Sequence, residues 1–221
     1  MSRRPGLLAQ IRADLVAQDR FGIAEGWAPS GTGFGAWWHR YKRSHHAAGI
    51  MIFFRIREWA RRRPTLFLPG LCDRLIEIIH GSTIGRGVTR GTGVYFPHGQ
   101  SHIHGQTSIG DCTVVGVDAG IGLRGSFFSD DMGTKGPTIG SYVRVGTGAK
   151  VLGAVTIGDR AVIGAGAVVL DDVPEAATAV GVPARIIRQG PTGDELPAAL
   201  ERLAALRAMA GSEKWDVGSG T

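Results

Sequence analysis

The sequence predicts a mainly β protein in which very short parallel strands wind into a three-sided coil, with an α-helical region before it and a short helix after it. Three observations lead to this prediction. Glycine accounts for 35 of 221 residues without the every-third-residue period of collagen. Neither the period of 3.6 of a helix nor the period of 2 of an ordinary strand competes over the middle of the chain. An aliphatic residue recurs every six positions there, at Ile103, Ile109, Val115, Ile121, Ile139, Val145, Val151, Ile157, Ile163 and Val169.

Each six-residue unit supplies one strand with a single inward aliphatic side chain, followed by small residues that let the chain turn a corner. Glycine commonly follows the aliphatic residue, and small residues recur four positions on, as at Thr113, Ala149 and Ala161. Three units complete one triangular coil. Stacked coils then bury a column of Ile and Val side chains, which forms the predicted core.

Two interruptions of the six-residue register mark places where groups other than the core matter. Upstream, Ile78, Ile84 and Phe96 follow the same spacing one phase earlier, which indicates an inserted residue near His102. Downstream, residues 123–138 lack aliphatic side chains in the inward positions, yet Ile139 resumes on phase. We interpret 123–138 as a loop outside the coil, and loops on rigid scaffolds are where binding groups concentrate.

The chain divides into a helical N-terminal region over 1–76, the coil over 77–188, and a C-terminal helix with a flexible tail over 189–221. Helical spacing is found at 7–20 and 36–63, and the second segment places an apolar run before several arginines. Such a segment is typical of helices that pack on a neighbouring subunit and keep a solvated basic face. The other interpretation is a peripheral membrane contact through 49–63.

Composition narrows the possible partners. The net charge is +6 with a pI near 9.9, which suits nucleic acid, an anionic membrane or a phosphorylated ligand. Nucleic acid is not expected, because the basic residues are scattered and no aromatic-interleaved motif appears. The only cysteines, Cys72 and Cys112, form no CxxC pair, and no signal peptide or membrane-spanning run is recognisable, so a cytoplasmic location is expected.

Several stretches resemble a known family. The segment "GTGAKVLGAVTIGDRAVIGAGAVVLDDVP", the closing "DVPEAATAVGVPARIIR", and the opening "IRADLVAQD" and "RYKRSHHAAG" resemble the hexapeptide-repeat acyltransferases, specifically the serine acetyltransferase-like branch. This resemblance implies a left-handed parallel β-helix and acetyl-CoA as acyl donor. It also implies a homotrimer or a dimer of trimers, with active sites in the groove between neighbouring prisms.

The resemblance assigns a role to one histidine of "GVYFPHGQSHIHGQ". In the family, a histidine after the first coils acts as general base, and His98 occupies that place. An imidazole suits this task because its pKa near 6.5 lets it accept a proton from a hydroxyl at neutral pH. His102 and His104 match no family residue, so they are expected to line the substrate groove.

The chain departs from the serine acetyltransferase pattern where serine's own charges would bind. The Asp before the catalytic histidine is Pro97, and the carboxylate that would orient the imidazole falls on Thr83. The Arg-His before a proline becomes Lys135 and Gly136. We therefore expect an O-acetyltransferase acting on a hydroxyl of a small molecule, a sugar or a carrier-linked intermediate; His80, with Glu77, is a candidate to replace the missing carboxylate.

For the donor, the positions matching the family's CoA contacts are Gly125, Thr147, Lys150, Ala165 and Arg185. The two cations suit the nucleotide phosphates.

Three alternatives remain open from the sequence: serine O-acetyltransferase proper, a non-catalytic β-helix scaffold, and a γ-type carbonic anhydrase-like zinc enzyme. The zinc enzyme would draw on His80, His98, His102 and His104. The acetyltransferase interpretation expects no metal.

Overall fold

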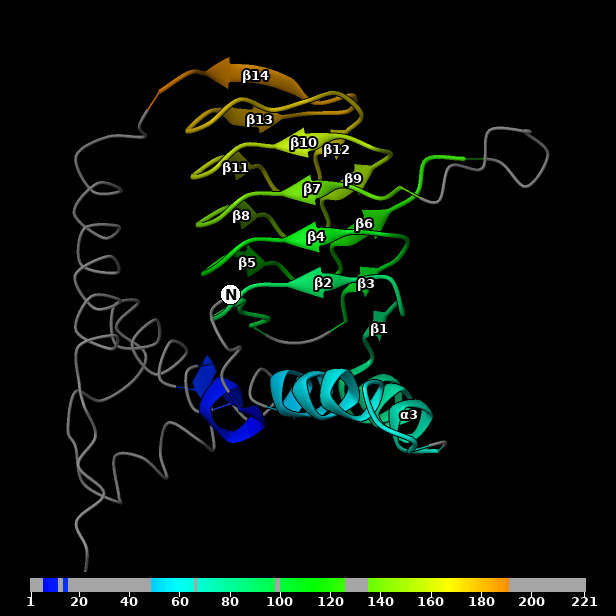
Figure 1. Cartoon of the computed structure of the whole chain (residues 1–221). Helices are drawn as coiled ribbons and strands as arrows, with labels where there is room; N and C mark the ends of the chain where they lie inside the picture. Colours follow the sequence, from blue (N-terminus) through cyan, green and yellow to red (C-terminus); the bar gives the residue numbers. More distant parts are fainter. Residues whose placement is uncertain are drawn as a thin grey trace, which may run out of the picture.

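The computed structural model describes residues 6–11, 14–15, 49–65, 67–97, 100–125 and 135–190. Its main body is a three-sided prism of parallel strands that rises from a base of helices (Figure 1). The first sheet has the order β1-β3-β6-β9-β12, the second β10-β7-β4-β2, and the third β14-β13-β11-β8-β5, in which only β14 is antiparallel. This is the predicted left-handed β-helix fold.

The strands are two to four residues long and follow one another around the prism. The first sheet contains β1 (Thr83–Ile84), β3 (His102–Ile103), β6 (Gly120–Gly122), β9 (Lys150–Leu152) and β12 (Val168–Val169). The second contains β2 (Thr89–Arg90), β4 (Ser108–Ile109), β7 (Thr138–Ile139) and β10 (Thr156–Ile157). The third contains β5 (Val114–Val115), β8 (Arg144–Val145), β11 (Val162–Ile163), β13 (Thr178–Val180) and β14 (Arg185–Arg188).

The predicted aliphatic column is confirmed as the core. All ten aliphatic positions from Ile103 to Val169 are buried. In the two-residue strands the second residue points inward and the first outward, because side chains alternate across a strand. The outward positions are therefore the ones free to build a site.

Strand pairing confirms the interruptions of the repeat. Thr83 pairs with His102, nineteen positions on, whereas His102 pairs with Gly120, eighteen positions on, so the first coil contains one extra residue. Gly120 pairs with Lys150, thirty positions on, so this coil contains twelve extra residues. Of the expected loop 123–138, residues 123–125 and 135–137 contain no strand, Thr138 already begins β7, and 126–134 lie outside the described residues.

The start of the coil differs from the prediction. Helix α3 (Leu68–His80) extends to His80 and ends at Gly81, whose φ of 61° lets its N–H donate to Glu77 O at 2.9 Å. Residues 77–80 are thus helical, and Ile78 is 78% exposed rather than inward-facing. The six-residue spacing between Ile78 and Ile84 is a coincidence, because Ile78 belongs to α3 and Ile84 to β1.

Only part of the other predicted helices is described. Residues 7–11, 14–15 and 49–60 are helical. Residues 12–13, 16–20 and 36–48 lie outside the described residues, as does 191–221, where the C-terminal helix was expected. Within the described residues, no helix is both long enough and apolar enough to span a bilayer.

Buried charged side chains help to close the base of the prism, beside apolar ones such as Ile50 and Phe54. Arg90 occupies the inward position between Ile84 and Phe96, and its side chain is 2% exposed. It donates to Asp14 at 3.1 Å and its guanidinium lies 4.7 Å from the Phe54 ring centroid. Burial lowers the pKa of Arg90 to about 10, although the Asp14 charge opposes the shift. The N-terminal helices are therefore joined to the coil through a buried ion pair.

Arg57 makes a second such link. It is fully buried, stacks 4.4 Å from the Phe54 ring centroid, and donates to Ile84 O at 2.7 Å and to Asp73 at 2.8 Å. Phe54 thus contacts two guanidinium groups, an arrangement that cation–π attraction favours.

Candidate functional site

Three outward side chains of the first sheet form a hydrogen-bonded cluster near the base. Thr83 Oγ1 lies 2.9 Å from His102 Nδ1 and 3.1 Å from His104 Nε2. The β1–β3 pairing brings Thr83 beside His102, and His104 follows at the strand's end. A threonine hydroxyl has a single proton, so at least one ring nitrogen must donate to it. The donor and acceptor roles of the two rings are therefore linked through Thr83.

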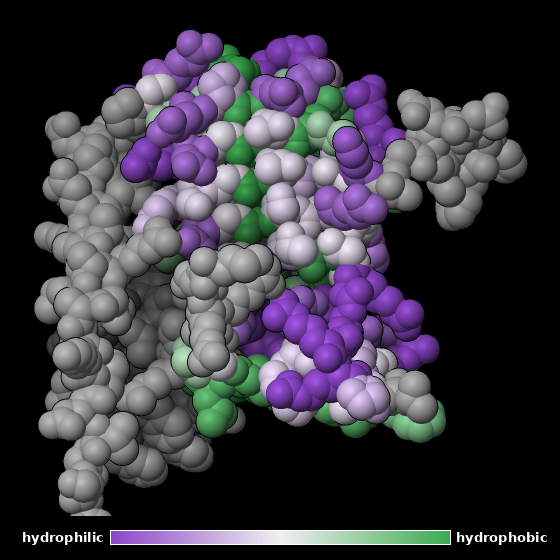
Figure 2. All heavy atoms as spheres, in the orientation of Figure 1, coloured by the Kyte–Doolittle hydropathy of each residue, from purple (hydrophilic) through white to green (hydrophobic). Residues whose placement is uncertain are grey.

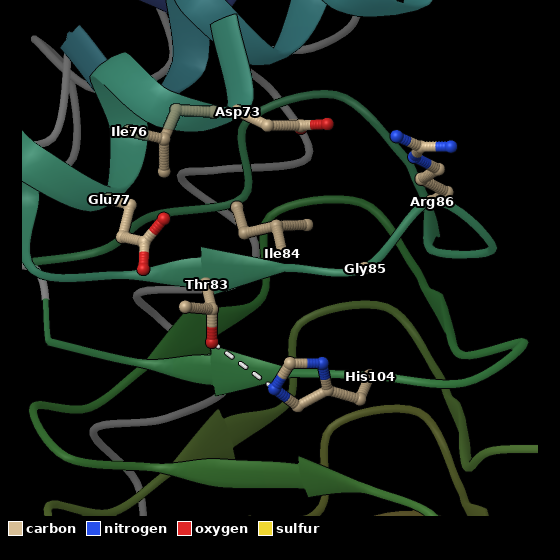
Figure 3. A pocket seen from close by; sticks show the side chains of 8 residues that line it. All are labelled: Asp73, Ile76, Glu77, Thr83, Ile84, Gly85, Arg86 and His104. Carbon is tan, nitrogen blue, oxygen red and sulfur yellow. Dashed lines mark hydrogen bonds between the residues drawn. The ribbon is translucent and has the colours of Figure 1, made fainter. Parts of the chain in front are cut away.

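Beside this cluster lies a pocket between α3 and the first two coils (Figure 3). Its lining is Asp73, Ile76, Glu77, Thr83, Ile84, Gly85, Arg86 and His104. Helix α3 supplies two carboxylates, the corner after β1 supplies Arg86, and the corner after β3 supplies His104. Asp73 accepts from Arg57 at 2.8 Å and Glu77 from Arg74 at 2.9 Å, each through one carboxylate oxygen. The pocket thus presents both negative and positive groups to a ligand.

The expected loop is anchored next to His104. A Cβ on Gly136 would lie 2.3 Å from Thr107 Oγ1 and 3.1 Å from His104 O, and a Cβ on Gly105 would lie 2.7 Å from a methyl group of Leu123. These close approaches explain the two glycines. Both ends of the loop therefore pack on the corner that carries His104, and the exposed Lys135 lies at that junction.

His80 is buried at the end of α3, next to the corner that carries Pro97 and Gln100. Its expected role beside His98 stays a prediction, because His98 lies outside the described residues. The His80 ring is 5% exposed, tilted against Phe53 at 6.3 Å between centroids, and so close to Gly49 that a Cβ there would be 2.5 Å from Nε2. It is not among the residues that line the pocket. Its backbone oxygen accepts from Gln100 N at 3.0 Å, so His80 supports the corner that follows Pro97 through its main chain.

His98 and Gly99 lie outside the described residues, but their neighbours are described. Tyr95 bridges to Val114 in the third sheet, and His102 begins a strand of the first sheet. Pro97 and Gln100 are therefore at the corner between the third and first sheets.

The same corner carries most of the residues proposed for the donor. Thr147 and Ala165 are exposed and occupy equivalent corners of neighbouring coils, where Gly166 N donates to Thr147 O at 2.8 Å. Lys150 starts the next strand, and its Nζ donates to Asp118 O at 2.7 Å. Arg185 opens β14 above them, with a side chain that is 69% exposed. Gly125 is the exception, because it follows β6 at the opposite edge of the first sheet.

Two charged residues of the pocket, Asp73 and Arg86, were not predicted from the sequence. Asp73 lies in a helix whose position relative to the coil no repeat reveals, and Arg86 lies in a corner otherwise made of glycines. Within the ranges the structure describes, no group of three or more His, Cys, Asp or Glu side chains is placed to hold a metal ion.

Comparison with known proteins agrees with this fold and repeat. Residues 136–171 match the family model "Bacterial transferase hexapeptide (six repeats)". A serine acetyltransferase of Synechococcus elongatus is 36% identical over 157 residues, covering 66% of this chain and 59% of that protein. One from Bacillus licheniformis is 48% identical over 75 residues, covering 34% of each. The chain thus spans between a third and three fifths of the length of these curated relatives.

Solved structures of serine acetyltransferases also align with this chain. The serine acetyltransferase of Brucella abortus aligns with a TM-score of 0.62 and 26% identity, covering 85% of this chain and 68% of that one. The soybean enzyme complexed with serine aligns with a TM-score of 0.63 and 26% identity, covering 83% and 70%.

The repeats and the prism define a hexapeptide-repeat protein with a left-handed parallel β-helix. Within that class the chain is similar to the serine acetyltransferases named above.

Proposed function

We propose that this protein is an acetyl-CoA-dependent O-acetyltransferase in which His98 is the general base. The observation that supports this most is the shared corner. Along one edge of the prism lie Thr147, Ala165 and Lys150. At the lower end of the same edge lie Pro97 and Gln100, which flank His98 in the sequence. A CoA molecule lying along this edge would bring its thioester toward His98, while the Thr83 cluster and its pocket occupy the adjoining face.

The chemistry is acyl transfer. His98 accepts the proton of the acceptor hydroxyl, whose oxygen forms a bond to the thioester carbonyl carbon. Backbone N–H groups stabilise the tetrahedral oxyanion. The C–S bond then breaks, the CoA sulfur leaves with the proton held by His98, and the products are an acetyl ester and free CoA. Lys150 and Arg185 would meet the nucleotide phosphates.

For the acceptor, the relatives' names support serine more than the sugar expected from the sequence. The pocket supplies a physical reason, because Asp73 and Glu77 suit an ammonium and Arg86 suits a carboxylate. These groups provide charges that Pro97 and Gly136 lack. A hydroxyl acceptor without an ammonium remains the second candidate, since Pro97 carries neither a charge nor an N–H.

The acceptor is tested by measuring CoA release from acetyl-CoA with L-serine, and separately with a panel of sugars and carrier-linked hydroxyl compounds. If serine is the acceptor, Arg86→Gln should raise its KM about tenfold or more, while Arg160→Gln, on an exposed corner at the other end of the prism, should not. Turnover of the panel without turnover of serine would replace serine by the second candidate. Absence of His98-dependent turnover with any acceptor would defeat the acetyltransferase proposal.

Assembly follows from the same proposal. If CoA lies between neighbouring prisms, a monomer has only half a donor site, so activity requires a homotrimer or a dimer of trimers. Light scattering combined with activity measurements on the same fractions tests this, and an active monomer would contradict it.

A further inference from the structure

Helix α3 is apolar on two opposite sides. One side packs into the base of the prism through Cys72, Ile76 and His80. On the other side, Phe67 is 87% and Ile78 is 78% exposed, and Leu71 is 54% exposed. At about 100° per residue, these three side chains point within roughly 40° of one another and about 140–180° away from Ile76. Exposed apolar side chains that gather on one face, as the stripe of Phe67, Leu71 and Ile78 does, mark interaction surfaces more often than single exposed leucines do.

Arginines flank the stripe. Arg62 and Arg63 are exposed in the turn just before α3, whereas the adjacent Arg61 donates to Arg86 O in the first coil and to Glu58. Arg74 is 73% exposed within the stripe and is paired with Glu77 at 2.9 Å. Arg63 stacks on Trp59 at 4.1 Å. Between residues 49 and 82 the chain has six arginines and three carboxylates. Figure 2 shows hydrophilic side chains gathered over the helical base on the side turned to the viewer, with apolar surface along the lower edge.

We propose that the outward face of α3, together with Arg62 and Arg63, docks on an anionic lipid bilayer. A helix of 13 residues is about 20 Å long, so it lies in the interface plane instead of crossing the membrane. The apolar stripe enters the boundary between headgroups and acyl chains. The arginines bind lipid phosphates, and Trp59 has the amphipathic ring that is enriched at this depth.

Charge favours a bilayer over a second copy of the chain as the occupant. A two-fold contact through the stripe would bring Arg62, Arg63 and Arg74 close to their own equivalents, and like charges across an interface are unfavourable. Anionic headgroups instead neutralise these same side chains.

The membrane segment expected from the sequence was 49–63, and the structure places the contact differently. Ile50, Met51 and Phe54 are buried against the coil, and Arg55 and Arg57 are bonded within the base. Arg61 likewise donates to Arg86 O in the first coil. Only the last two residues of that segment, Arg62 and Arg63, belong to the proposed surface. The apolar part is supplied by α3.

The test is co-sedimentation of the full chain with vesicles of phosphatidylcholine alone or phosphatidylcholine mixed with phosphatidylglycerol. Binding to the mixed vesicles should be at least about tenfold stronger, and salt near 1 M should release the protein. Arg62→Gln and Arg63→Gln should each weaken binding about fivefold. Ile78→Glu should weaken it more than about tenfold, because a carboxylate replaces an inserted side chain.

Matched controls lie at the opposite end of the prism. Ile187 is 66% exposed on β14, so Ile187→Glu makes the same chemical change away from α3, and Arg188→Gln matches the arginine changes. Neither control should alter vesicle binding. Equal binding to both vesicle types, no binding, or equal effects of Ile78→Glu and Ile187→Glu would overturn the proposal. If the wild type self-associates but does not bind vesicles, and Ile78→Glu abolishes the self-association, the stripe is a contact between two copies of the chain.

Discussion

Arg90 Nη2 lies 3.1 Å from Asp14 Oδ2, with both side chains buried where the prism meets its helical base. The same carboxylate accepts from Arg55 at 2.8 and 3.2 Å and from Gly93 N at 2.9 Å. One aspartate therefore joins the first helix, the helix over 49–60 and the first coil. Its loss would leave two arginines without their counter-charge.

Replacing Asp14 with Asn is expected to lower the free energy of unfolding by about 3 kcal/mol, because breaking one side of a buried pair strands a charge. Denaturant unfolding measures this. Glu175→Gln, which breaks the exposed pair with Arg160, is the control and should cost less than about 1 kcal/mol. Adding Arg90→Leu to Asp14→Asn should recover part of the loss, and a purely additive further loss would contradict the pairing.

The ionisation of the Asp14 carboxylate predicts that the free energy of unfolding depends on pH. Burial by itself would raise the pKa of Asp14, but the Arg55 hydrogen bond and the Arg90 and Arg55 charges hold it below the usual 3.8. A carboxyl with a lowered folded-state pKa contributes stability that is fully present above about pH 4 and is lost as the pH falls through the folded value. The difference in unfolding free energy between wild type and Asp14→Asn should thus shrink below pH 4. A constant difference would show that Asp14 does not titrate in this way.

His98→Ala should lower turnover by about two to four orders of magnitude and leave CoA affinity near normal, because it removes the proton acceptor and not the donor site. Steady-state kinetics and CoA titration by calorimetry separate the two effects. His102→Ala and His104→Ala should act mainly on the acceptor KM. If His98→Ala turns over at a rate near that of the wild type, His98 is not the general base.

Thr83→Val should raise the acceptor KM severalfold, because it deletes the hydroxyl that holds His102 and His104 in place while conserving side-chain shape. Thr89→Val makes the same exchange at the equivalent outward position of β2, on the neighbouring sheet, and should change neither kinetic constant. If both variants behave alike, Thr83 has no role in positioning the histidines.

Lys150→Met should weaken CoA binding about ten- to a hundredfold, the usual effect of losing a charge-assisted contact, with little change in the acceptor KM. Equilibrium titration with CoA measures this. Arg144→Met, on the third sheet, changes an exposed cation at a comparable height and should leave CoA affinity intact. An unchanged CoA affinity in Lys150→Met would move the donor site away from this corner.

Much of the prism could be predicted because its signal is local. The inward aliphatic column, the extra residue of the first coil and the twelve extra residues before β7 all follow from six-residue spacing, and the strand pairing confirms them. The same rule misplaced Ile78, which fits the spacing but lies on an exposed helix face. The six-residue rule also did not identify position 90 as inward-facing, because the residue there is an arginine and not an aliphatic residue. Nothing in the repeat explains an arginine at that position.

The sequence by itself thus determined the coil, its core and the branch of proteins it resembles, because a repeat places each residue through neighbours six positions away. Only the tertiary structure decided what closes the base and what surrounds the histidines. Asp14 meets Arg90 across 76 positions, and α3 brings Asp73 and Glu77 to His104. Such contacts depend on how a non-repeating helix packs on the first coil, and side-chain packing between distant segments leaves no periodic signal in the sequence.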